Sequence, residues 1–417
     1  MIYHPGYRAI IVEEAIMTDT WQKALEELKE YIDKHSNIEI GFDFVCIPSD
    51  VRPEFYRLFN SVCVDFLKDN FPISLEEGYA LSKNYSEVSR SVINTLNLES
   101  IDVQTDINWL LLDPINGLTR RLFDPLFDLL KRKTDLTTFK QTATCDVEEA
   151  FREFFREGYQ KWIAISIIKL LSPDKNYHVP VDINSEDESE LGLVLGEKAM
   201  PKARETDKIA FNRNPLTFTV AKVIIHSKRL ACFVAIHTNF TEARRRARMV
   251  SGAREWLQIT DIKREFGLSQ LWPDMTISVG GDLDDVALVA DYSRIVQPDL
   301  IVECMEKKDW YDKDRLALVE RHLNTLKPKL GSYVVCRELV PESAIKDLEP
   351  GRVQVSVIQS PAEETKQEPL VAGAVPVAAA NKSVLAPQPS RNIHLLGIGY
   401  DISQLEPIVE ALTKGSG

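Results

Sequence analysis

The stretch from Asp284 to Glu338 decides the fold class. It runs DDVALVADY (284–292), PDLIVECM (298–305), EKKDWYDKD (306–314), RLALVERHLNTLKPK (315–329) and LGSYVVCRE (330–338). Two apolar runs of strand length precede a polar loop, an amphipathic run with helical spacing and a third apolar run. This order predicts strand, strand, loop, helix, strand in a mixed α/β layer. Acidic residues fall at the strand ends, where α/β proteins often hold their sites.

The segment before this stretch predicts a β-hairpin in the centre of the sheet. Leu216–His226 and Arg229–Asn239 are apolar runs joined by a two-residue turn. If His226 lies opposite Arg229, both faces of the pair are apolar, which is typical of strands covered on both sides. A helix over residues 241–258 is expected to follow.

The end of the chain predicts a strand that returns to the sheet. Arg352–Gln359 has the pattern of a strand, and the proline- and alanine-rich stretch 360–390 is expected to be extended and mobile. Asn392–Ile398 then predicts a strand and Ile402–Thr413 a helix. A lone strand and helix cannot bury a core, so we expect a last strand of the sheet rather than a tethered tail, in a sheet of about six to eight strands.

The N-terminal part is predominantly helical in its pattern. Apolar residues from Trp21 to Ile32 recur at helical spacing, a strand is predicted over Ile38–Ile47, and residues 53–133 are mostly helical. Val147–Leu171 predicts one long helix whose aromatic stripe belongs to a core.

These patterns predict an α/β protein, α+β overall, with a mostly helical domain followed by a mixed-sheet domain. The helical domain, with a small strand component, is expected over residues 1–175. The prolines and acids of 172–190 predict an exposed linker or loop around the domain boundary. We assign 176–204 to this linker or loop, and the mixed-sheet α/β domain covers 205–417.

Charge and cysteine usage limit the partners and the compartment. The formal net charge of −13 disfavours broad binding to nucleic acid or to an anionic membrane, since both need basic surface, but leaves room for a local basic groove. The N-terminus has no secretory pattern, and the longest apolar run, 162–171, is about half a membrane span, so a cytoplasmic protein without membrane contact is expected. No cysteines form a CxxC pair. Four lie in strand-like runs and are expected to be buried, reduced thiols: Cys46, Cys232, Cys304 and Cys336.

One candidate site is catalytic. Pro298-Asp299, followed by Glu303 and Lys308, resembles the PD-(D/E)xK nuclease family. The resemblance implies Mg²⁺ or Mn²⁺ held by acids on neighbouring strands, with a lysine that steadies the attacking water. The sequence departs from that family at Met305, where the lysine would stand. Asp299 and Glu303 are also roughly 13 Å apart along one strand, too far for one ion. Asp291, at the end of the preceding predicted strand, could complete a metal site with Glu303 or with Asp299.

A second candidate is the basic helix EARRRARMVSGAR (242–254). Arg244, Arg248 and Arg245 fall near one face of it. They could bind phosphates or an acidic partner, and nucleic acid only locally. They could equally neutralise the protein's own acids.

A third candidate is the turn Gly397-Ile-Gly399-Tyr400-Asp401, which lies between a strand and a helix. Such a turn can cradle a phosphate, but the third glycine of the dinucleotide fingerprint is missing. A tight turn with Asp401 as a helix cap is the simpler interpretation.

The sequence therefore leaves two functional hypotheses. The first is a protein that acts by protein or ligand contacts, as an assembly or regulatory component, with a protein partner and no cofactor. The second is a metal-dependent nuclease or phosphodiesterase centred on Asp291, Asp299, Glu303 and Lys308. The first leads because each catalytic candidate departs from the spacing that its chemistry needs.

Overall fold

The computed structural model describes residues 19–179, 203–211, 223–238, 273–287, 297–307, 310, 313–338, 354–358 and 392–415. By its internal contacts the chain divides into two compact units. We call Met1–Ala80 with Asp113–Arg152 the helical unit, and Leu81–Leu112 with Glu153–Gly417 the sheet unit. Compactness does not measure independent folding, so the domain boundaries expected at residues 175 and 205 stay a prediction.

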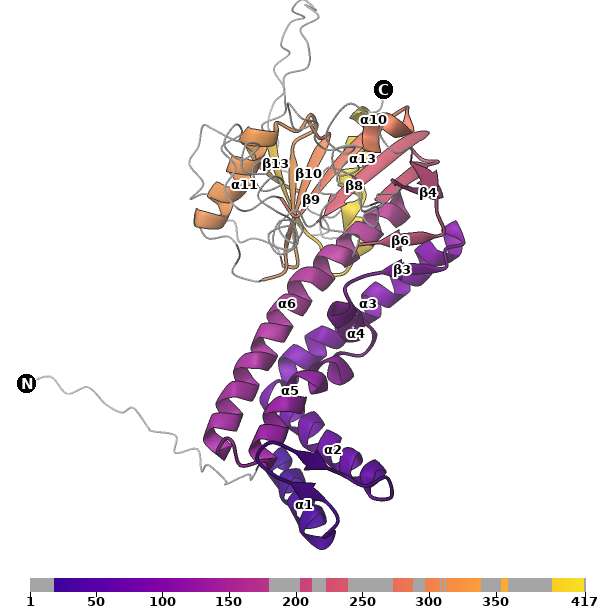
Figure 1. Ribbon diagram of the computed structural model, residues 1–417. Helices are drawn as coiled ribbons and strands as arrows, with labels where there is room; N and C mark the ends of the chain where they lie inside the picture. The colour runs from indigo at the N-terminus through magenta and orange to yellow at the C-terminus, as the bar shows by residue number, and fades with distance from the viewer. Residues whose placement is uncertain are drawn as a thin grey trace, which may run out of the picture. The chain divides into compact units, whose positions relative to one another are not determined.

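The helical unit is built around aromatic side chains. Its elements are α1 (Thr20–Lys34), β1 (Glu39–Ile40), β2 (Val45–Cys46), α2 (Arg52–Asn70), the start of α3 (Pro72–Leu96), α5 (Pro114–Leu130) and the start of α6 (Leu136–Leu170) (Figure 1). The rings of Trp21, Phe66 and Phe139 lie 5.3 to 5.7 Å apart, so α1, α2 and α6 meet at one aromatic cluster. Helical spacing of large apolar residues therefore places the core where the sequence expects it.

The strand predicted over Ile38–Ile47 is instead a short antiparallel hairpin. Glu39 pairs with Cys46 and Ile40 with Val45, which leaves residues 41–44 as the hairpin tip. A Cβ built on Gly41 would overlap the ring of Phe44, so the glycine leaves room for this ring in its present position. The exposed position of Cys46 in β2 also makes the prediction of a buried thiol wrong at this residue.

The sheet unit contains one nine-stranded mixed sheet, in the order β12-β13-β11-β10-β9-β8-β7-β4-β5. Its strands are β4 (Pro173–His178), β5 (Arg204–Glu205), β7 (Val223–Ser227), β8 (Cys232–Thr238), β9 (Met275–Gly280), β10 (Leu300–Met305), β11 (Ser332–Cys336), β12 (Gln354–Ile358) and β13 (Asn392–Gly397). The first four strands in that order run parallel, and from β10 onwards each neighbour is antiparallel. The α/β class and the mixed sheet are therefore confirmed.

Shorter elements complete the sheet unit. They are β3 (Ser100–Asp102) and β6 (Lys208–Ala210), which pair in parallel, with α4 (Thr105–Leu112), α10 (Leu283–Ala287), α11 (Lys313–Leu326), the 3-10 turn η2 (Ile402–Leu405) and α13 (Glu406–Gly415). The rest of α3 and α6 also belongs here. The deciding stretch is confirmed over β10, α11 and β11. Its first strand is wrong over 284–287, which belong to α10, and the rest of that run, 288–292, lies outside the described residues.

The predicted return of the last strand to the sheet is confirmed. β13 lies between β11 and β12 and pairs with both in parallel, as Leu395 does with Val334 and Val357. The prediction that residues 172–178 begin a linker is wrong, because Pro173–His178 forms β4. Stretch 360–390 lies outside the described residues.

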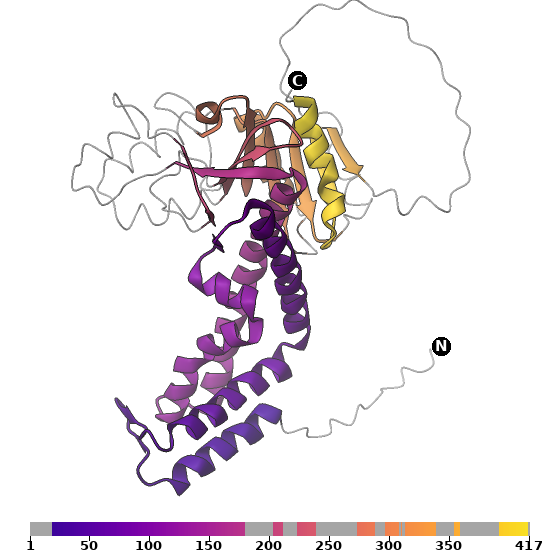
Figure 2. The same ribbon diagram turned by 90° about the vertical axis from the view of Figure 1, so that its right-hand side faces the viewer.

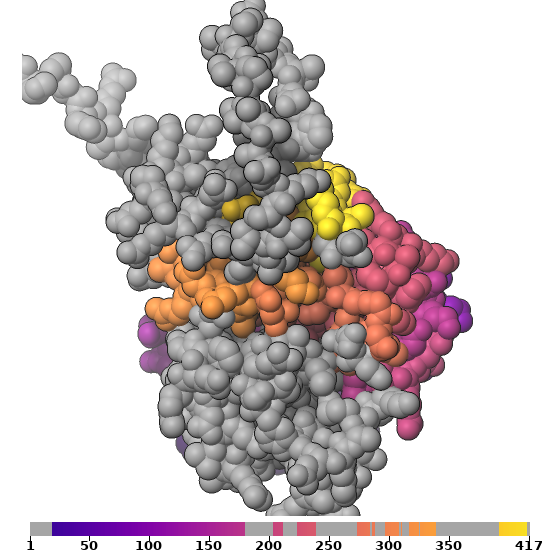
Figure 3. Space-filling view, turned by 90° about the horizontal axis from the view of Figure 1, so that it is seen from above, coloured from indigo at the N-terminus to yellow at the C-terminus, as the bar shows by residue number. Residues whose placement is uncertain are grey.

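Helices cover both faces of the parallel half of the sheet. On one face α11 packs its Val319 and Leu323 against Met305 and Val334. Tyr333 is the neighbour of Val334 on β11, so its side chain points to the opposite face of the sheet. There its hydroxyl donates a hydrogen bond to the carbonyl of Pro407, at the start of α13. Figure 2 shows α13 lying along the sheet. In Figure 3, orange residues of 297–338 and rose residues of 223–238 are both seen from above. The sheet is therefore a covered layer, as its apolar strands require.

The hairpin of β7 and β8 has a longer turn than the sequence predicts. Ser227 pairs with Cys232 and His226 with Phe233, so the predicted pairing of His226 with Arg229 is wrong. The register differs by four positions, an even number, and each side chain therefore keeps its predicted face. Ala231 closes the turn with a φ of 52°.

We expect Ala231→Gly to raise the free energy of unfolding by about 0.5 to 1 kcal/mol, because the left-handed backbone strains any residue with a Cβ. Ala235→Gly, in the middle of β8, should lower it by a similar amount. Urea denaturation of both variants measures this. Equal destabilisation by the two changes would contradict the four-residue turn.

Candidate functional site

Asp299, a candidate metal ligand, is used inside the sheet. It is 3% exposed and directly precedes β10. Its Oδ2 accepts a hydrogen bond of 2.7 Å from the backbone N–H of Val279, and its Oδ1 accepts one of 2.8 Å from the Lys329 ammonium. At one end of the β9–β10 pair, the carboxylate thus accepts a backbone N–H that would otherwise bond to a carbonyl of the neighbouring strand.

Glu303, the second candidate acid, lies in a buried polar cluster. Its Oε1 is 2.7 Å from Nδ1 of His322 on α11, and the two side chains are 6% and 1% exposed. Its Oε2 accepts a bond of 3.4 Å from the N–H of Asp274. The Asp274 carboxylate in turn accepts a bond of 2.8 Å from the N–H of Cys304. Side chains therefore also continue the β9–β10 hydrogen bonding at its other end.

The two acids have separate partners and do not converge. Strand geometry places the Cα atoms of Asp299 and Glu303 roughly 13 Å apart. Across the described ranges no group of three His, Cys, Asp or Glu side chains could hold a metal ion. Asp291 and Lys308 lie outside the described residues, so the nuclease hypothesis stays a prediction. Arg244, Arg245 and Arg248 lie outside them as well.

The glycine turn after β13 has the geometry of a cap. Gly399 has a φ of 53°, and the Asp401 carboxylate accepts bonds from the N–H and the hydroxyl of Ser403. These bonds hold the pKa of Asp401 below its usual value. The simpler interpretation of Gly397–Asp401, a tight turn that begins a helix, is confirmed.

The thiols expected in the sheet are buried, except at Cys46. Cys232, Cys304 and Cys336 are all buried and free. Burial raises the pKa of Cys304 well above its ordinary value, and the nearby Asp274 carboxylate adds to the effect. This thiol is therefore protonated at neutral pH and does not act as a nucleophile.

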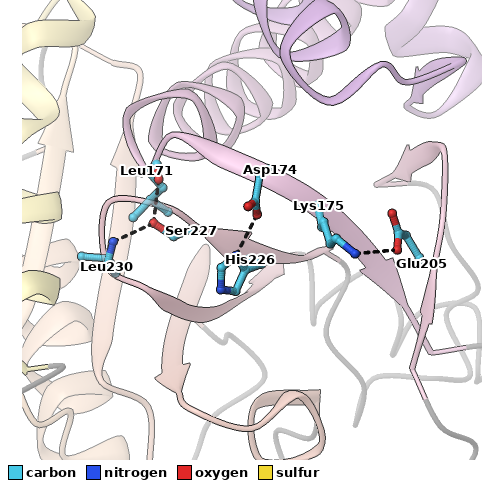
Figure 4. Close-up of polar contacts among 7 residues, drawn as sticks. All are labelled: Leu171, Asp174, Lys175, Glu205, His226, Ser227 and Leu230. Carbon is cyan, nitrogen blue, oxygen red and sulfur yellow. Dashed lines mark hydrogen bonds and ion pairs between the residues drawn. The ribbon is translucent and has the colours of Figure 1, made fainter.

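A half-exposed His–Asp pair lies where β4 meets β7 (Figure 4). The register shifts between Pro173 and Lys175, so Asp174 is the extra residue of a β-bulge. The bulge turns its Oδ1 to within 2.7 Å of Nδ1 of His226, and the side chains are 28% and 32% exposed. Ser227 anchors the same corner through its hydroxyl, which donates to the carbonyl of Leu171.

This pair fixes the orientation of an imidazole at the surface. The hydrogen bond from His226 holds the pKa of Asp174 below its ordinary value. A carboxylate on one ring nitrogen leaves the other nitrogen able to accept a proton or bind a ligand. In the described part of the chain, the adjacent charged pair is Lys175 with Glu205, at 3.3 Å. This neighbouring pair adds neither a nucleophile nor a set of metal ligands to the His–Asp pair.

The helical unit presents large apolar side chains to solvent. Of the eight that are exposed in the described residues, seven belong to it: Phe42, Phe44, Tyr56, Ile73, Tyr79, Phe123 and Leu136. Tyr56 on α2 and Phe123 on α5 are 39% and 42% exposed, and their rings stack with centroids 6.4 Å apart. Exposed clusters of this kind mark contact surfaces in soluble proteins.

The hairpin tip adds two further rings. Phe42 is 64% exposed and Phe44 is 56% exposed. The ammonium of Lys133, just beyond α5, lies 5.1 Å from the Phe42 ring centroid and 3.8 Å from the Asp43 carboxylate. The tip is thus attached to the end of α5 by a cation–π contact and a weak ion pair.

Sequence reasoning missed both the Asp174–His226 pair and this aromatic surface. Asp174 lay in a predicted linker, so no strand pairing placed it beside His226. The signal for the hairpin tip was present in the sequence GFDF (41–44), where phenylalanines surround an acid after a glycine.

The chain was compared with protein families, curated proteins and solved structures. No family model, curated protein or solved structure matches it. Among the described helices, none combines the length and the apolar character needed to cross a membrane.

We expect Glu303→Gln to lower the free energy of unfolding by about 1 to 3 kcal/mol, because it weakens a buried bond to His322. Glu306→Gln is the matched control, since Glu306 is only half-buried, and should change stability by less than about 0.5 kcal/mol. Chemical denaturation measures both. A Glu303→Gln protein as stable as the wild type would show that the buried cluster is not structural.

We expect Asp174→Asn to remove a pH-dependent contribution to stability. The folded-state pKa of Asp174 is lowered, so the carboxylate stabilises the fold above its ordinary pKa and loses that effect as the pH falls through the folded value. The stability difference between wild type and Asp174→Asn should therefore be constant near pH 7 and shrink below about pH 4.

His226→Gln should remove the same acid-dependent difference, whereas Lys175→Gln should leave it in place. Thermal unfolding at a series of pH values measures all three variants. A difference for Asp174→Asn that stays constant down to about pH 2 would contradict the pairing.

Proposed function

We propose that this protein acts by binding another polypeptide, as an assembly or regulatory component, and that the helical unit carries the contact surface. One observation supports this most directly. Seven of the eight large apolar side chains exposed in the described residues belong to the helical unit. Large rings in water represent apolar area that association can bury, at roughly 25 cal/mol per Å².

The residue types fit a protein contact. Tyrosine and phenylalanine supply rigid apolar area at a small entropic cost, and aromatic residues are enriched at the centres of interfaces. Tyr56 and Phe123 pack on Phe59 and Phe127, two buried residues whose ring centroids lie 4.7 Å apart. A surface ring on a rigid core keeps its position, so little order is lost when a partner covers it.

The catalytic hypothesis receives less support from the described geometry. Asp299 and Glu303 each bond to groups within the sheet, and a carboxylate so engaged would have to break those bonds to bind a metal. We therefore retain a nuclease or phosphodiesterase only as the alternative that a direct assay decides.

Photo-crosslinking from defined positions tests the proposal. A photoreactive phenylalanine analogue at Tyr56 or Phe123 should form protein adducts in intact cells, because these side chains lie in the proposed contact. The same analogue at Glu410, on the exposed side of α13 in the sheet unit, is the control and should form few. Phe123→Ser should suppress adducts from Tyr56 without lowering thermal stability by more than a few degrees.

Equal labelling from Glu410 and from the helical unit would contradict a dedicated surface. Cleavage of nucleic acid by the purified protein with Mn²⁺, abolished by Glu303→Gln, would instead support the catalytic alternative. Absence of both adducts and cleavage would remove both hypotheses in their present form.

A further inference from the structure

The Asp174–His226 pair holds a reactive group that the proposed contact surface does not use. The Asp174 carboxylate can only accept a hydrogen bond, so the proton of a neutral imidazole lies on Nδ1 of His226, 2.7 Å from Oδ1. The lone pair of the ring is therefore on Nε2. Nε2 makes no hydrogen bond with any described residue, and Figure 4 shows it turned away from the carboxylate. The β-bulge thus presents a surface imidazole in one tautomer.

The two strands beside His226 fix its ring and leave one edge open. Phe233 lies directly across from it on β8, and the two rings meet edge to face with centroids 5.2 Å apart. Lys175 lies directly across from it on β4. Side chains at such positions have Cβ atoms about 5 Å apart, so the long side chain of a lysine there can reach a group bound to Nε2. The His226 side chain is 32% exposed and is therefore accessible from solvent.

Two lysines supply positive charge beside the open nitrogen. The Lys175 ammonium lies 3.3 Å from Glu205, and the two side chains are 51% and 60% exposed. An ion pair this exposed contributes little stability, so the flexible lysine can turn to another anion at small cost. Lys228 is exposed and forms no ion pair with a described residue. The hydrogen bond from His226 is the main cause that lowers the pKa of Asp174, and the Lys228 charge adds to it, which places Lys228 near the pair.

These features together indicate the kind of group that suits His226. The two ammonium groups oppose a metal cation, and the described residues form no set of three metal ligands. The Nε2 lone pair requires an electrophile, whereas the lysines favour an anion. A phosphoryl group is both, because its phosphorus accepts an electron pair and its oxygens carry negative charge.

We propose that His226 accepts a phosphoryl group at Nε2 from a small acyl phosphate. The Nε2 lone pair attacks phosphorus, the N–P bond forms, and the bond between phosphorus and the acyl oxygen breaks. That oxygen leaves with the electron pair as a carboxylate. Asp174 stabilises the positive charge that the ring acquires, and the Nδ1 proton then passes to water. Lys175 turns from Glu205 to the oxygens of the phosphoryl group.

The modification changes the charge where β4 meets β7. A phosphoryl group adds about −2 charge and three acceptor oxygens, beside the carboxylates of Asp174 and Glu205. An N–P bond also hydrolyses readily, so the change is reversible. A reversible change of charge on the surface suits a regulatory component. The inference concerns the sheet unit, and it stands without the contact surface that we propose for the helical unit.

Reaction of the full-length protein with acetyl phosphate tests the proposal. Phosphorus NMR distinguishes a phosphoryl group on Nε2 from one on Nδ1, and mass spectrometry of alkaline digests identifies the modified residue among the seven histidines. We expect phosphorylation of His226 at Nε2 to be about tenfold faster than that of His35. His35 is the internal control, because it is half-buried and its Nδ1 lies 2.8 Å from the carbonyl of Tyr31. It therefore has the same tautomer without a carboxylate.

Variants separate the roles of the neighbouring side chains. Asp174→Asn should slow the phosphorylation of His226 about tenfold, because an amide does not balance the charge on the ring. Lys175→Gln should slow it several-fold, whereas Lys175→Arg keeps the cation and should restore the wild-type rate. Lys414→Gln, exposed on α13, is the control and should have no effect. The rate at His35 should be the same in every variant, and thermal unfolding shows whether each variant is folded.

Three results would overturn the proposal. They are equal rates at His226 and His35, a phosphoryl group on Nδ1 of His226, and a rate at His226 that is unchanged in a folded Asp174→Asn protein. The first two need only the wild type, so a variant that fails to fold does not leave the question open. Crosslinking from Tyr56 to a partner, with no phosphorylation of His226, would retain the proposed function and overturn only this inference.

Discussion

The sheet depends on the carboxylates that hold its central seam, where antiparallel pairing changes to parallel. The β9–β10 ladder contains only three registered pairs, from Leu300 with Ile277 to Val302 with Met275. Asp299 accepts the N–H of Val279 beyond one end, and Asp274 accepts the N–H of Cys304 beyond the other. Because buried backbone donors must find acceptors, these side chains lengthen a ladder that backbone alone would leave short. The buried bond between Glu303 and His322 then fixes α11 over this seam.

This arrangement changes the interpretation of the acids in PDLIVECM. Acids at strand ends in an α/β sheet suggest chemistry because carboxylates there often face a ligand. Here the lysine and histidine that meet them, Lys329 and His322, come from α11 and the segment after it. A buried carboxylate is tolerated only with such partners, since desolvation otherwise opposes its charge. The residue types alone could not distinguish a structural acid from a catalytic one.

Local patterns predicted much of the fold, and long-range pairing set the limit. β10, α11 and β11 could be predicted because each has an unbroken period and clear polar boundaries. The last strand could be placed because its segment offers too little surface to form a core alone. Prediction failed at Leu283–Ala287, where an apolar run served equally as a strand or a helix. It failed at β4 because Pro173 suits a bulge as well as a linker. The turn of the β7–β8 hairpin was misplaced because both of its strands are apolar on both faces, so sliding the pair exposes nothing.

The surface of the helical unit was the least predictable feature, because exposure depends on packing rather than on residue type. Tyr56 and Phe59 lie within one turn of α2, and only Phe59 is buried. The hairpin tip is different, because its residues contact one another. Gly41 makes room for the Phe44 ring, and Lys133 supports Phe42. A turn that only reversed the chain would gain from polar residues, which bond to water and favour such turns. Two phenylalanines at that position forgo this advantage, and their exposed rings agree with the contact surface that we propose for the helical unit.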